Sequence, residues 1–244
     1  MPDRDDAVRL RPLEALARLV EGNRRFVAGE PERPDQTTSR RAALGGGQHP
    51  FALVLSCADS RVPPEIVFDA GLGDLFVVRS AGHVLDHAIL GTLEFGVEQI
   101  GTPVLVVLGH TGCGAVKATL QARTAHAAAS GTDIDVLLDA IAPAVADAER
   151  EVAWSPEPDE KDEPDTAVLD LAVRHHVERV VAQVRSAPLV APAVRRGAVV
   201  VVGGVYDLAS GRVDVVVPPD APVAPAAGAS QDHVGAGHGP AGRP

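Results

Sequence analysis

Two short runs of apolar residues constrain the fold of this chain most strongly. Residues 51–55 and 103–108 contain no charged side chain, and each leads into a polar or glycine-containing segment. A short apolar run bounded by turn residues is typical of a central strand in a parallel sheet, which is buried on both faces. The first run leads into Cys57 and the second into His110. Side chains capable of chemistry therefore follow two predicted central strands.

Amphipathic patterns typical of helices alternate with predicted strands along the chain. Helices are predicted over residues 12–28, 83–100, 113–129, 134–152 and 166–184, with shorter helical segments at 38–44 and 63–68. Further strands are predicted over residues 74–79, 198–206 and 212–217, and the last two form a hairpin by their spacing.

Strands that alternate with helices predict an α/β fold with a central, mostly parallel sheet. Because crossovers between parallel strands are right-handed, the first strand should lie beside both the second and the third. We therefore expect a single domain with about five strands in the order 2-1-3-4-5, flanked by helices, with the last strand antiparallel.

Composition indicates where the domain ends. The domain is expected to cover residues 1–217, with residues 1–45 as an N-terminal helical arm. Residues 218–244 are rich in proline, alanine and glycine and are expected to form a disordered tail. The acidic residues 155–165 should form an exposed loop. Of the 244 residues, 45% are hydrophobic, which is enough for a substantial core.

The charge balance excludes some classes of function. Lysine and arginine number 22 against 33 aspartate and glutamate, so the net charge is −11, which makes nucleic acid an improbable partner. No apolar run approaches the roughly 20 residues of a membrane helix, and no leader precedes the first helix, so we expect a cytoplasmic protein. Two cysteines in a cytosolic chain favour metal binding or catalysis over disulfides.

Three residues have the chemistry of a zinc site. Cys57 ends the first strand, while His110 and Cys113 follow the third, and the carboxyl ends of neighbouring parallel strands meet at one edge of the sheet. Two thiolates and one imidazole suit Zn²⁺. Three protein ligands leave a fourth position open for water, which is the catalytic arrangement, whereas structural sites have four protein ligands.

At these residues the chain closely resembles β-class carbonic anhydrases. The matching segments are residues 57–62, 74–79, 109–115, 203–208 and 211–213. The likeness extends from about residue 13 to residue 217 and excludes the tail. Each segment alone is a weak signal, but all of them in the same order make a strong one.

The resemblance implies a mechanism. Zinc held by Cys57, His110 and Cys113 would supply a hydroxide that attacks carbon dioxide, giving bicarbonate and a proton reversibly. Asp59 would orient the hydroxide by accepting its hydrogen bond, and Arg61 would keep Asp59 ionised. The family also has a resting state in which the aspartate takes the fourth zinc position.

The resemblance also implies substrate contacts and a partner. Gln48, Phe76 and Phe95 match substrate-side positions of the family, and the Gly114 backbone N–H, near a helix N-terminus, could hydrogen-bond bicarbonate. The N-terminal arm would lie across a second copy, giving a homodimer or a dimer of dimers. Some pocket walls, Phe76 or Phe95 among them, would then come from the other subunit.

Alternatives remain at this stage. The same scaffold could hydrolyse carbonyl sulfide or carbon disulfide, and a non-catalytic zinc protein would have a closed site. A dithiol redox protein using Cys57 and Cys113 is disfavoured because the chain has no Cys-x-x-Cys motif. His83 and His87, four residues apart, could form a second metal site or a proton relay, but we expect ordinary polar helix residues.

Overall fold

The protein contains one five-stranded sheet, seen here in a computed structural model that describes residues 10–152 and 166–220. The strands are β1 (Ala52–Cys57), β2 (Leu75–Ser80), β3 (Val104–His110), β4 (Val200–Tyr206) and β5 (Val213–Val217). Their order is β2-β1-β3-β4-β5, and β5 alone runs antiparallel to its neighbour. The predicted fold class and strand order are confirmed.

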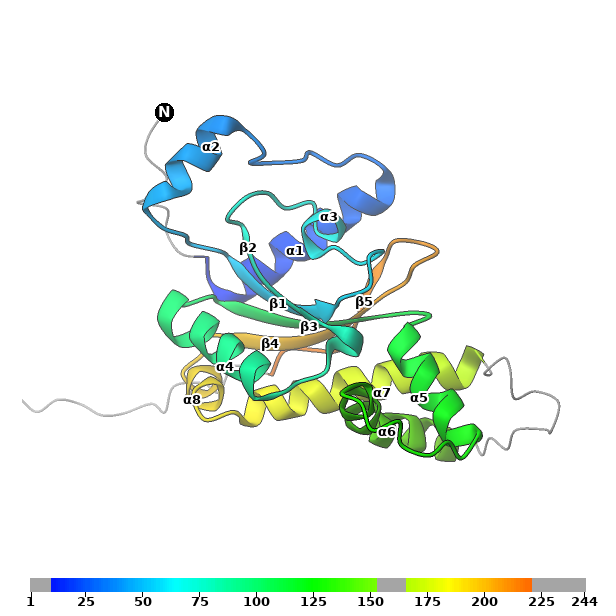
Figure 1. The fold of residues 1–244 in the computed structure, drawn as a ribbon. Helices are drawn as coiled ribbons and strands as arrows, with labels where there is room; N and C mark the ends of the chain where they lie inside the picture. Colours follow the sequence, from blue (N-terminus) through cyan, green and yellow to red (C-terminus); the bar gives the residue numbers. More distant parts are fainter. Residues whose placement is uncertain (1–9, 153–165, 221–244) are drawn as a thin grey trace, which may run out of the picture.

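Helices cover both faces of this sheet (Figure 1). The α-helices are α1 (Pro12–Ala28), α2 (Thr38–Ala43), α3 (Pro64–Val67), α4 (His87–Phe95), α5 (Gly114–Thr124), α6 (Ile134–Glu151), α7 (Thr166–Ser186) and α8 (Val190–Arg195). Three short helical turns, η2 (Leu44–Gly46), η3 (Ala81–His83) and η4 (Gly96–Ile100), join them to other elements. Helices α1 and α3 lie on one face, and α4 to α8 lie on the other.

The central strands are apolar because both of their faces are buried. In β1, Leu53 and Leu55 belong to the core beneath α4 to α8, whereas Ala52 and Val54 belong to the core beneath α1 and α3. Successive side chains of a strand point to opposite faces, so the continuous apolar run fills two cores at once. This arrangement fixes the register of β1 and therefore the position of Cys57 at its end.

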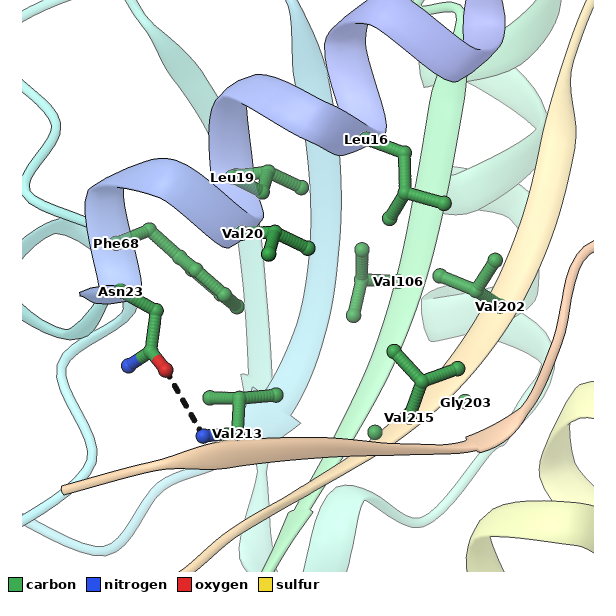
Figure 2. Close-up of a pocket in the computed structure, with 11 residues that line it drawn as sticks. Leu16, Leu19, Val20, Asn23, Phe68, Val106, Val202, Gly203, Val213 and Val215 are labelled. Atoms are coloured by element: carbon green, nitrogen blue, oxygen red, sulfur yellow. Dashed lines mark hydrogen bonds between the residues drawn. The ribbon is translucent and has the colours of Figure 1, made fainter. Parts of the chain in front are cut away.

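Helix α1 packs on the sheet of its own chain. Leu19 is buried against the face of the sheet that α1 covers. Asn23 hydrogen-bonds three backbone groups: its amide nitrogen donates to the carbonyl oxygens of Val67 and Gly211, and its side-chain oxygen accepts from the N–H of Val213. Figure 2 shows Asn23 directed at β5, with apolar side chains lining a small pocket between α1 and the strands. The helix is therefore fixed to its own sheet by its inner face.

The structure differs from the sequence prediction around residues 81–100. The single helix expected over residues 83–100 is instead the turn η3, the helix α4 and the π-turn η4. Gly82 and His83 have φ angles of 62° and 46°, in the left-handed region, which ends any right-handed helix. The short helix α8 has no counterpart in the prediction.

Other predicted features lie outside the described residues. These are the acidic loop at 155–165, residues 1–9 and all but the first residues of the tail at 218–244. Within the part of the chain that the structure describes, no helix is long and apolar enough to cross a membrane.

One glycine sets how closely α1 approaches the loop after α3. A Cβ atom at Gly22 would overlap the backbone carbonyl of Phe68. We expect Gly22→Ala to lower the free energy of unfolding by about 1–3 kcal/mol, because the helix must move away from the loop. Gly91→Ala in α4 is the control, since its Cβ would meet nothing within 4 Å. That variant should gain about 0.5–1 kcal/mol from helix propensity. Urea denaturation measures the free energy of unfolding of both variants. Equal changes in the two variants would contradict a close approach of α1 to this loop at Gly22.

Candidate active site

The site lies at the carboxyl end of the parallel strands. Cys57 is the last residue of β1, and His110 is the last residue of β3. Ser56 pairs with Leu108 across these strands, so Cys57 and His110 leave the sheet side by side. The two segments therefore meet in space, as the strand order predicts.

His110 directs an unpartnered nitrogen into the site. The ring is fully buried, and its Nδ1 lies 3.0 Å from the carbonyl oxygen of Thr111. Because a carbonyl oxygen only accepts hydrogen bonds, Nδ1 carries the proton in the neutral ring and Nε2 keeps a free lone pair. Nε2 is buried and has no hydrogen-bond partner among the described residues. A buried acceptor of this kind could serve as a metal ligand.

Cys113 reaches the same point from the start of α5. It is the N-cap of that helix, and the preceding Gly112 has a φ of 62°. Glycine adopts this conformation without a steric penalty, so the chain can turn back sharply after His110. The cysteine is 1% exposed.

The three side chains form a group with the dimensions of a metal site. The sulfur atoms of Cys57 and Cys113 are 4.0 Å apart, and the three candidate ligand atoms lie within 4.8 Å of one another. Tetrahedral zinc with Zn–S distances near 2.3 Å requires a sulfur–sulfur separation of about 3.8 Å. Residues of this type, at this spacing and fully buried, could hold a metal ion.

The two thiols share their protons unequally. A hydrogen bond from Cys113 lowers the pKa of the Cys57 thiol to about 4, and hydrogen bonds from the backbone N–H groups of Asp59 and Gly82 act in the same direction. The Cys57 thiolate and burial together raise the pKa of Cys113. One thiolate is thus present before any metal binds, and a cation would displace the proton of the other.

A carboxylate and a guanidinium lie beside this group. Arg61 donates from Nε and Nη2 to the two carboxylate oxygens of Asp59, at 2.9 and 2.6 Å, and its backbone N–H donates to the same carboxylate. Asp59 Oδ2 is 3.9 Å from His110 Nε2. The hydrogen bond from the Arg61 side chain holds the pKa of Asp59 well below its usual range. Asp59 is therefore ionised at the edge of the site.

A second arginine, Arg79, supports the loop that carries these residues. From the end of β2 it donates to the carbonyl oxygens of Cys57 at 2.9 Å and Asp59 at 2.6 Å. In the sequence, Arg79 stands out only as part of a matching segment. Its position near the end of the strand before Ser80 could have suggested a role beside Cys57, but its hydrogen-bond partners depend on how the strands pair.

Comparisons with known proteins bear on this geometry. A family model described as carbonic anhydrase matches residues 52–213. Carbonic anhydrase 2 of Mycobacterium tuberculosis is 40% identical over 201 residues, covering 82% of this chain and 91% of the relative. The carbonic anhydrase of Mycolicibacterium smegmatis is 42% identical over 205 residues, covering 84% and 93%. The chain belongs to the β-carbonic anhydrase family.

Solved structures agree with this assignment. The β-carbonic anhydrase of Coccomyxa in complex with acetazolamide is 28% identical, with a TM-score of 0.60, covering 84% of this chain and 87% of that one. A tetrameric β-carbonic anhydrase of Sordaria macrospora, at 20% identity and a TM-score of 0.63, shares the fold. The enzyme class predicted from the sequence, carbonic anhydrase, is confirmed.

Three residues that the carbonic anhydrase resemblance assigned to the substrate lie at the opposite edge of the sheet. Phe76 pairs with Leu53, four residues before Cys57, which is a distance of about 13 Å along the strand. Phe95 is 52% exposed and packs on Phe76 with ring centroids 6.5 Å apart. Gln48 precedes β1 and is exposed. Within one chain these residues do not line the Cys57 site.

The remaining predictions concern Gly114 and two histidines. Gly114 is exposed and begins α5 directly after Cys113, so its N–H lies at the site. His83 and His87 do not share a helix face: His83 is fully buried in η3, and His87 is exposed at the start of α4. Among the described residues, Cys57, His110 and Cys113 are the one group of three or more that could hold a metal ion.

Proposed function

We propose that this protein hydrates carbon dioxide reversibly to bicarbonate and a proton, with zinc held by Cys57, His110 and Cys113. The observation that carries the proposal is the buried Cys-His-Cys group beside an ionised aspartate that is paired with an arginine. Membership of the β-carbonic anhydrase family supports it. When bound, zinc lowers the pKa of a coordinated water to about 7, which supplies a nucleophile at neutral pH.

Asp59 and Arg61 give the nucleophile its direction. The Asp59 carboxylate lies within 3.9 Å of His110 Nε2, so it can accept a hydrogen bond from a group at the open metal position. Arg61 holds both carboxylate oxygens and also lies 3.4 Å from the carbonyl oxygen of Gly112, which ties the two ligand-bearing loops together. A closed structural site would need neither residue.

The N-terminus of α5 is suited to binding the bicarbonate product. Helix N-termini carry unpaired N–H groups and a partial positive charge, and both favour anions. Gly114 begins α5, and its N–H can donate to bicarbonate beside the metal ligands. This is the role expected of it from its position near a helix N-terminus.

A second copy of the chain completes the substrate pocket in this proposal. Gln48, Phe76 and Phe95 contact substrate only if the edge of the sheet that bears them lies over the Cys57 site of a partner. The apolar rings of Phe76 and Phe95 would form a wall suited to a nonpolar gas, and the Gln48 amide could donate to a substrate oxygen.

A partly exposed apolar stripe along α1 supports such a dimer. Leu13, Val20 and Val27 are 56%, 54% and 42% exposed, although Val20 also lines the pocket between α1 and its own sheet. Residues seven apart drift by only about 20° around a helix, so the three side chains form one apolar stripe. A two-fold dimer would cover this stripe, and dimers of dimers can follow from it.

The function is tested by replacing Asp59 in zinc-loaded protein. Asp59→Asn keeps the shape of the side chain but removes its charge, so kcat/KM for hydration should fall about 100-fold as the nucleophile loses its orientation. The matched control is Asp139→Asn, the same substitution at an exposed acid of α6, which should retain wild-type activity. Stopped-flow measurement of proton release gives both rates.

Wild-type activity should rise as the pH increases through neutrality, because the nucleophile forms by loss of a proton. Asp59 does not cause this rise: its pKa is depressed, so its charge is lost only in strong acid. Parallel assays with carbonyl sulfide and carbon disulfide separate hydration from the hydrolase alternative. Zinc-replete protein without hydration activity at alkaline pH would rule out the proposal.

The dimer is tested by placing a charge on the stripe. Val20→Lys should convert the dimer to a monomer in sedimentation velocity experiments, because burying an unpaired ammonium is costly. Val136→Lys in α6 is the matched control, with the same substitution at a valine that is 60% exposed. A wild type that stays monomeric at micromolar concentration, or a Val20→Lys dimer, would contradict this interface.

A further inference from the structure

Two buried histidines lie behind the metal-ligand group and are not part of it. His83 is 0% exposed and His176, from α7, is 3% exposed. Their rings pack with centroids 4.5 Å apart. His83 also packs on the strand that carries His110, since a Cβ at Gly109 would lie 3.3 Å from its Cε1. Burying an imidazole nitrogen without a hydrogen-bond partner is costly, and within the described part of the chain both rings contain such nitrogens.

His176 makes one hydrogen bond, and its direction is fixed. Its Nε2 lies 2.9 Å from the carbonyl oxygen of Gly82, which only accepts, so Nε2 carries the proton. Burial lowers the pKa of His176 to about 4, so the ring is neutral at physiological pH. The other nitrogen, Nδ1, is buried with no partner among the described residues.

Gly82 connects this histidine to a metal ligand. Its backbone N–H donates to the sulfur of Cys57 at 3.3 Å, while its carbonyl accepts from His176. Gly82 has a φ of 62°, and a Cβ there would lie 2.8 Å from Ile141 Cδ1. One glycine thus faces the thiolate on one side and α7 on the other.

The backbone at this point is strained and needs support. His83, which follows Gly82, has a φ of 46°, in the left-handed region that non-glycine residues seldom adopt. Such conformations cost about 1–3 kcal/mol and persist only where the surroundings enforce them. The hydrogen bond from His176 and the packing of its ring on His83 are contacts from α7 that help to enforce it.

We propose that His176 is a positioning residue of the metal centre: through Gly82 it holds a backbone N–H on the Cys57 thiolate. The proposal rests on the function proposed above, in which Cys57 is a zinc ligand. A hydrogen bond to a ligating thiolate fixes the sulfur in place and withdraws part of the charge that it donates to the metal. Without His176, the strained turn relaxes and this N–H leaves the sulfur.

The test compares two variants of similar size in the full chain. His176→Leu fills the space of the imidazole but has no donor, whereas the amide of His176→Gln can donate to the Gly82 carbonyl. His175→Leu is the matched control, because His175 is the neighbouring residue on α7 and faces Glu151 and Glu178 at the surface. Circular dichroism first establishes that each variant is folded.

Metal binding, not activity, is the measured quantity. Co²⁺ is titrated into metal-free protein against a chelator, and the thiolate-to-cobalt absorption band is recorded. We expect His176→Leu to bind Co²⁺ about 10- to 100-fold more weakly, the loss typical of groups that support a metal ligand, and to shift this band. His176→Gln and His175→Leu should match the wild type in both measurements.

Folded His176→Leu with wild-type affinity and band would overturn the inference, as would a His176→Gln variant as weak as His176→Leu. If His176→Leu does not fold, His176→Gln decides: wild-type affinity supports the inference, and a tenfold loss overturns it. Wild-type protein that binds Co²⁺ without a thiolate band would refute the zinc site itself and this inference with it. The failure of the proposed function is therefore distinguishable from the failure of the role of His176.

Discussion

The parallel pairing of β1 with β3 is the constraint on which the site depends. Cys57 and Cys113 are 56 positions apart in the chain, yet their sulfur atoms lie 4.0 Å apart because both strands end at the same edge. Each strand is held in register by apolar side chains in two cores, so neither Cys57 nor His110 can shift without moving a buried strand. The ligands are thus placed by the packing of the sheet, and the loops need only turn the side chains inward.

The sequence alone predicted the parts of the fold that short-range chemistry determines. Helix α1 begins at Pro12 and ends before Gly29, as predicted, because proline suits a first turn and glycine suits the left-handed C-cap. Strands β1 and β3 were recognisable because a wholly apolar run must be buried on both faces. The Cys-His-Cys group followed from the positions of Cys57 and His110 at the ends of neighbouring strands.

What the sequence did not reveal depends on contacts between distant segments. The left-handed turn at Gly82 and His83 interrupts a helical pattern, and the hydrogen bond and ring contact from His176, a residue distant in the sequence, help to keep that conformation. Arg79 holds the backbone of the Cys57 loop, which no spacing in the sequence indicates. Residues such as Phe76 matched the family's substrate positions, but the register of β2 places them at the far edge of the sheet. The family resemblance implied that Phe76 or Phe95 would come from the other subunit, but only the strand register shows that Phe76 lies far from the Cys57 site of its own chain.

The central claim is that two sulfurs and one imidazole nitrogen bind zinc and leave one position open. X-ray absorption at the zinc edge of the full-length protein tests it most directly. We expect zinc to have two sulfur neighbours at about 2.3 Å, one imidazole nitrogen at about 2.0–2.1 Å and one further light atom that exchanges with added anions. A shell with fewer than two sulfurs, or with a second imidazole in the fourth position, would contradict it.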